Sequence, residues 1–161
     1  MRSPVALKSL SVILFVFALG HTLGTSSPQV RRGPAEAALF RAMQSYRFPI
    51  MGFTRSYWDF YRGFALTISV QLALMAVIAW QVGSLAQRDP RLALSLGVTL
   101  LLGCIGVGVI SWFFFFGGPI VFSAVTVLLA GAAVVLLRRG RAHRRLAEAH
   151  PQSPAPAGVS Q

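Results

Sequence analysis

The chain has 161 residues, of which 55% are apolar and 12% charged, with a mean hydropathy of +0.64. This length suits one domain, and the composition is too apolar for an ordinary soluble one. The net charge is +11, but the basic residues flank apolar stretches and no nucleic-acid-binding motif accompanies them, so we expect a membrane protein that does not bind nucleic acid.

Four apolar stretches approach or reach the ~20 residues that a helix needs to cross the hydrocarbon core. The last two come from one uncharged run, Leu92 to Leu137, which Gly117-Gly118-Pro119 divides. The predicted spans are residues 7–24, 62–82, 92–113 and 118–138. They predict an all-α fold, an integral membrane four-helix bundle within residues 1–138.

Small residues recur at every fourth position of three predicted spans, which favours close helix packing in a membrane. They are Ala65, Ser69 and Ala73, then Ser95, Thr99 and Gly103, then Thr126 and Ala130.

The first stretch has two interpretations. Arg2 and Lys8 followed by Leu10–Leu19 also resemble a secretory signal peptide, with Ala18-Leu19-Gly20 as its cleavage site. A retained helix is favoured, because the apolar character continues to Leu23, past the usual length of a signal's apolar region. Cleavage would leave three spans.

An amphipathic helix is predicted near residues 34–48, between the first and second spans. Pro34 suits the first turn of a helix, and Glu36 lies near its positive end. The predicted apolar face comprises Ala35, Ala38, Leu39, Ala42, Met43 and Tyr46. Such a helix would lie in the membrane interface or cap the bundle, and Pro49 and Gly52 would end it.

Charged and aromatic residues introduce the second span. On a continuous helix Arg55, Asp59 and Arg62 would share a face, with the carboxylate between two guanidinium groups. Interface anchoring explains the aromatic and arginine side chains, but it does not require an acid. The candidate partner-binding or structural motif is therefore Arg55, Tyr57, Trp58, Asp59, Tyr61 and Arg62.

His21 lies at the far end of the first span, in Gly20-His21-Thr22-Leu23-Gly24. The first helix leaves the membrane on the face where the second enters, so His21 and Asp59 are expected at similar depth. They are candidates for a proton relay, but a hydrogen bond that staples two helices is the simpler interpretation. No catalytic residue is assigned. His21 has no second intramembrane histidine and Cys104 is alone, so no metal or cofactor is expected.

The basic residues also predict an orientation. Nine lie on the side that holds both termini and the second-to-third loop, against six on the other side, which favours cytoplasmic termini. Residues 139–161 are expected to form a basic and then disordered cytoplasmic tail. Five arginines beside the fourth span would attract anionic lipid; they are Arg138, Arg139, Arg141, Arg144 and Arg145.

The combination of Gly20–Gly24, Met51-Gly52 and the segment Arg55–Tyr61 with Gly63-Phe64 resembles a family of small uncharacterised bacterial four-helix membrane proteins, the LIC-type hypothetical proteins. The resemblance covers about half the chain. It implies four spans and a link between His21 and the Asp59 region, and it supplies no substrate.

Three functions are compatible with these features. The first is an interaction or scaffold subunit of the bacterial inner membrane, bound to another membrane protein or to a second copy of itself. The second is a small membrane enzyme or redox subunit that uses His21 and Asp59 on a lipid-soluble substrate. A transporter is weaker, because no span carries a polar stripe. The first is favoured, because the nucleophile and metal clusters typical of enzymes are missing.

Overall fold

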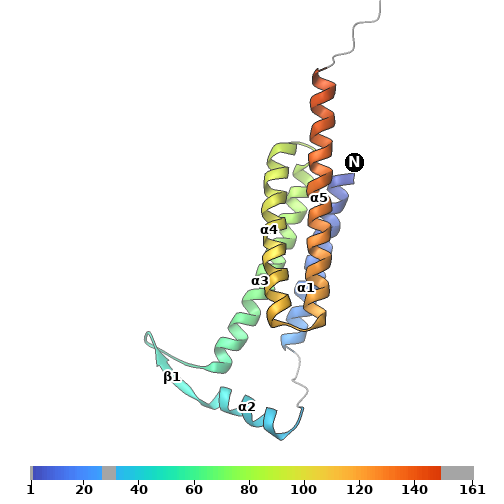
Figure 1. Cartoon of the computed structure of the whole chain (residues 1–161). Coiled ribbons are helices and arrows are strands. Elements are labelled where there is room, and N and C mark those ends of the chain that lie inside the picture. The colour runs from blue at the N-terminus through green and yellow to red at the C-terminus, as the bar shows by residue number, and fades with distance from the viewer. Residues whose placement is uncertain (1, 27–31, 150–161) are drawn as a thin grey trace, which may run out of the picture. The chain divides into compact units, whose positions relative to one another are not determined.

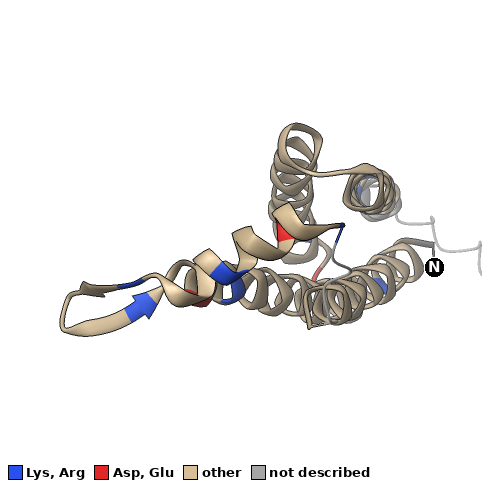
Figure 2. Ribbon diagram, turned by 90° about the horizontal axis from the view of Figure 1, so that it is seen from below, with Lys and Arg blue, Asp and Glu red and all other residues tan. Residues whose placement is uncertain are grey.

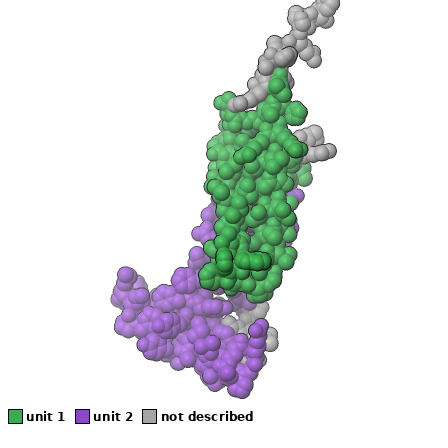
Figure 3. Space-filling model, in the orientation of Figure 1, with its two compact units in different colours: residues 1–7, 81–161 green, residues 8–80 purple. Residues whose placement is uncertain are grey.

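A computed structural model describes residues 2–26 and 32–149 (Figure 1). Its elements are α1 (Arg2–Ser26), α2 (Pro34–Ser45), β1 (Arg47–Ile50), β2 (Phe53–Ser56), α3 (Tyr57–Leu85), α4 (Pro90–Phe114) and α5 (Gly117–Ala149). The chain forms two compact units (Figure 3). One comprises residues 8–80, and the other comprises residues 1–7 and 81–161.

Four helices are long and apolar enough to cross a membrane, as expected of a multi-pass membrane protein. The candidate spans are Ser3–Ser26, Tyr57–Leu85, Pro90–Phe114 and Gly117–His143. The predicted division of the long apolar run is confirmed, because α5 begins at Gly117 with Pro119 in its first turn. Helix α5 also continues through the basic segment to Ala149, and residues 150–161 lie outside the described residues.

In the unit of residues 8–80, α1 and α3 pack antiparallel, as two contacts with reversed order show. The Ser11 hydroxyl donates to the carbonyl of Ala76 at 2.7 Å, and His21 Nδ1 lies 3.0 Å from the Ser69 hydroxyl. The α3 face that contains Ser69 and Ala76 is buried and made mostly of small residues. Small side chains let the two backbones approach closely, which is how helices associate in lipid.

In the other unit, α4 and α5 also pack antiparallel. Asp89 begins α4 by accepting hydrogen bonds from the backbone amides of Arg91 and Leu92 at 2.9 and 3.0 Å. Further along, the hydroxyls of Ser111 and Ser123 form a buried bond of 2.9 Å between the helices. This bond satisfies both polar groups inside an apolar interface.

The small-residue prediction is confirmed on α5 and wrong on α4. Thr126 and Ala130 are buried, whereas Ser95, Thr99 and Gly103 are exposed. The face of α4 that packs is Ala93, Gly97, Leu100, Cys104 and Ser111. The small residues of this face are not spaced strictly four apart. The predicted set of Ser95, Thr99 and Gly103 therefore identified the wrong face of α4.

The segment before α3 departs most from the prediction. Helix α2 ends at Ser45, and residues 47–56 form an antiparallel hairpin that pairs Arg47 with Ser56 and Ile50 with Phe53. Its two-residue turn, Met51-Gly52, has φ of 49° and 84°. The turn type whose twist matches that of the two strands requires a positive φ at both of its central residues. The chain therefore enters α3 from a strand, not from a helix.

Candidate functional site

The start of α3 is fixed by Ser56 and Asp59, which cap each other's backbone. The Asp59 carboxylate accepts from the Ser56 amide at 2.9 Å, and the Ser56 hydroxyl accepts from the Asp59 amide at 3.2 Å. This reciprocal pair is a capping box, and the carboxylate also lies at the positive end of the helix. Asp59 therefore helps to cap the start of α3, a structural role that was not predicted.

The expected Arg-Asp-Arg face does not form. Arg55 lies in β2 and not on the helix, so it is not one turn before Asp59. Its guanidinium lies 5.2 Å from the centre of the Phe53 ring and donates to the Thr54 carbonyl at 3.1 Å. Arg55 and Asp59 nevertheless both line a small pocket of about 260 Å³ at the start of α3.

Aromatic rings join α2 and the hairpin to the first turns of α3. Trp58 lies edge-on to Phe40 of α2 at 5.6 Å between ring centres, and it stacks on Tyr61 at 5.4 Å. Tyr57 contacts Phe48 of β1 at 5.0 Å. Each such pair contributes about 0.5–1.5 kcal/mol beyond its buried area. We call α2 and the hairpin, residues 34–56, the arm.

The predicted residues Tyr57, Trp58 and Tyr61 are thus one half of a cluster whose other half comes from the arm. Phe40 and Phe48 were not predicted, and Tyr46 was predicted only as part of the apolar face of the connecting helix. The pattern Ser56-Tyr57-Trp58-Asp59 before an apolar run marks a helix start, so the sequence did indicate that α3 begins after Ser56 and that Arg55 lies outside it.

One edge of the arm leaves apolar side chains uncovered. No residue of α2 is buried, and Leu39 of its predicted apolar face is 59% exposed. At the hairpin, Met51 is 95% exposed and Phe53 61%. Met51 also adopts a left-handed backbone conformation that costs a non-glycine residue about 1–2 kcal/mol. Local strain of this kind gathers at functional positions.

Basic residues accompany this apolar edge. Arg41 lies on α2, Arg47 on β1 and Arg55 on β2, and all three are exposed. Figure 2 shows Lys and Arg positions recurring along the arm, with acidic positions scarcer. The arm therefore exposes both apolar and basic side chains.

His21 and Asp59 are not brought together. The partner of His21 is Ser69, ten residues after Asp59 on α3, which is about 15 Å along a helix axis. The neighbouring hydroxyls of Thr22 and Thr25 donate to backbone carbonyls one turn earlier in α1. His21 therefore joins α1 to α3 through Ser69, and the expected hydrogen bond between His21 and Asp59 is not the one that does so. Across residues 2–26 and 32–149, no three His, Cys, Asp or Glu side chains gather as a metal site would need.

The basic segment of α5 is helical. Arg138 and Arg139 are exposed, whereas Arg141 is half-buried. The side chains of Arg144 and Arg145 lie outside the described residues. No protein-family model, curated protein or solved structure matches this chain.

Proposed function

We propose that the chain is an interaction or scaffold subunit of the bacterial inner membrane, and that its arm docks another membrane protein. In this proposal both termini lie in the cytoplasm and the arm lies on the outer face of the membrane. The excess of basic residues on the side of the termini supports this orientation.

The observation that carries the proposal is the uncovered edge of an otherwise well-anchored arm. The capping box and the aromatic contacts hold the arm to α3, yet Met51 is 95% exposed and Phe53 is 61% exposed. An isolated two-stranded hairpin is marginally stable in water, so its attachment to α3 is what positions this edge. Exposed apolar side chains flanked by polar ones are typical of protein interaction sites.

An enzyme or redox subunit is less well supported. That function required His21 and Asp59 to act on one substrate. His21 pairs with Ser69 instead, and Ser69 lies about three helical turns after Asp59 on α3. The chemistry of a shared proton relay requires hydrogen-bond reach between its groups.

Photo-crosslinking in the native membrane tests the proposal. A photoreactive amino acid replaces Phe53, and the matched control replaces Val70, which is 66% exposed within the α3 span. Met51→Asn is then added to the Phe53 probe, because asparagine tolerates the left-handed turn and removes the apolar side chain.

We expect one defined protein adduct from position 53, absent from position 70 and lost with Met51→Asn at unchanged expression. An adduct with a second copy would identify the partner as the chain itself. Lipid adducts alone, or a protein adduct that Met51→Asn leaves intact, would contradict the docking role.

A further inference from the structure

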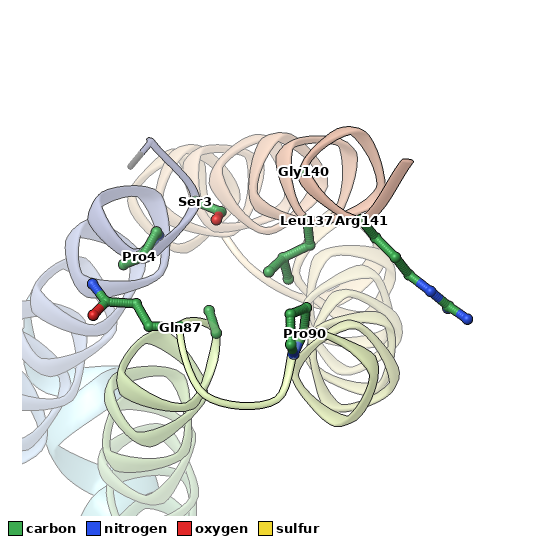
Figure 4. A pocket seen from close by; sticks show the side chains of 8 residues that line it. Ser3, Pro4, Gln87, Pro90, Leu137, Gly140 and Arg141 are labelled. Atoms are coloured by element: carbon green, nitrogen blue, oxygen red, sulfur yellow. The ribbon is translucent and has the colours of Figure 1, made fainter. Parts of the chain in front are cut away.

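A cavity of about 510 Å³ lies within the unit of residues 1–7 and 81–161, at its basic end (Figure 4). The start of α1, the turn between α3 and α4, and α5 all contribute to its lining. Pro4, Pro90 and Leu137 supply apolar surface, whereas Gln87 and Arg141 supply polar groups. This volume falls in the range of small-molecule sites, about 300–1,000 Å³.

Arg141 differs from the arginines beside it. It is half-buried, and its Nε is enclosed without a hydrogen-bond partner, whereas Arg138 and Arg139 are exposed. Figure 4 shows its guanidinium extending away from the other labelled side chains, while Leu137 points toward them. The guanidinium therefore lies on the outer side of the cavity, outside the group of side chains that Leu137 faces, and the enclosed Nε of Arg141 lacks an acceptor.

The cavity combines positive charge with apolar walls. Among the described residues, Arg141 is the charged residue in its lining and no acid lines it. Asp89, next to Pro90, is occupied by the amides that begin α4. Arg88, Arg91 and Arg138 lie within three residues of lining positions and add positive charge to this end of the unit. A ligand that suits both features carries an anion and an apolar part.

We propose that this cavity binds the phosphodiester headgroup of an anionic phospholipid. The phosphate would accept from Arg141 at the margin, and the glycerol and first acyl carbons would lie against Leu137 and Pro90. Leu137 is the last residue of the uncharged run and Arg138 follows it, so the cavity lies at the level where headgroups begin. Basic pockets between membrane helices are known binding places for such headgroups. A free phosphate would use the arginine and leave the apolar walls unfilled.

The test is binding of phosphatidylglycerol to the full chain in mild detergent, followed by native mass spectrometry. Phosphatidylcholine and inorganic phosphate are the comparison ligands. Arg141→Gln removes the charge at the cavity, and Arg139→Gln is the matched control on the exposed side of the same helix. Gly140→Leu adds an apolar side chain at the cavity wall, where a Cβ meets no atom within 4 Å, and is intended to obstruct the cavity.

We expect phosphatidylglycerol to bind more tightly than phosphatidylcholine. Arg141→Gln should weaken it about tenfold, because a charge-assisted hydrogen bond is lost. Arg139→Gln should weaken it less than about threefold, as exposed charges contribute little. Gly140→Leu should also weaken binding while the protein stays folded, which separates occupancy of the cavity from loss of charge.

Equal losses in Arg141→Gln and Arg139→Gln would show general attraction to the basic helix and overturn the cavity site. Full binding by Gly140→Leu would do the same. Inorganic phosphate that competes as well as the lipid would overturn the lipid assignment. None of these results depends on the arm, so this proposal and the docking role fail separately.

Discussion

Loss of the Ser56 hydroxyl should loosen the start of α3 without unfolding the spans. Ser56→Ala removes the acceptor of the Asp59 amide, and Ser56 is only 3% exposed, so water cannot readily replace it. Replacing a capping serine costs about 1 kcal/mol, which corresponds to about a fivefold increase in local opening. Hydrogen exchange followed by mass spectrometry, in detergent, should therefore show about fivefold faster exchange over residues 56–62.

The control is Ser95→Ala, which removes an exposed serine of α4. It should leave exchange at residues 56–62 unchanged. Ser56→Thr keeps a hydroxyl and should behave nearly as the native chain does. Unchanged exchange in Ser56→Ala would refute the capping box, and with it the explanation of how the arm is held.

Three further changes test the packing of the spans by thermal unfolding in detergent. Ser69→Ala removes the partner of His21 and should destabilise the protein by about 0.6 kcal/mol, the average for a hydrogen bond between membrane helices. Ser123→Ala removes a buried interhelical bond of 2.9 Å and should cost about 0.6–1.7 kcal/mol. Gly97→Leu should cost about 1–3 kcal/mol by overpacking, because even a Cβ would meet Leu137 at 3.3 Å. Stability equal to that of the native chain in any of the three would contradict the contact concerned.

The four apolar helices were predictable because length and hydropathy alone decide them. The break at Gly117-Gly118-Pro119 was predictable for a similar reason, since glycine and proline act locally. The packed face of α4 was not, because lipid and protein neighbours are equally apolar and the pattern does not separate them.

The hairpin of the arm was not predicted, because the spacing of Arg55, Asp59 and Arg62 was interpreted on the assumption that all three lie on one helix. Arg55, Asp59 and Arg62 share a face only if the helix extends back to Arg55, and Ser56 ends that possibility. The hairpin itself carries weak signals: Pro49 lies in a strand, and Met51 takes a turn position that asparagine or glycine usually fills. Its stability comes from rings on α3, which a local pattern does not contain.

In the proposed topology, α3 crosses the membrane, the arm lies on the outer side and the basic end of the chain lies in the cytoplasm. Cysteine labelling in spheroplasts tests it most directly, in a Cys104→Ser background with Gln44→Cys on α2 or Gln87→Cys after α3. Both glutamines are exposed. An impermeant maleimide should label position 44 at once and position 87 only after the membrane is permeabilised. Labelling of both positions in intact spheroplasts, or of position 87 alone, would contradict the account.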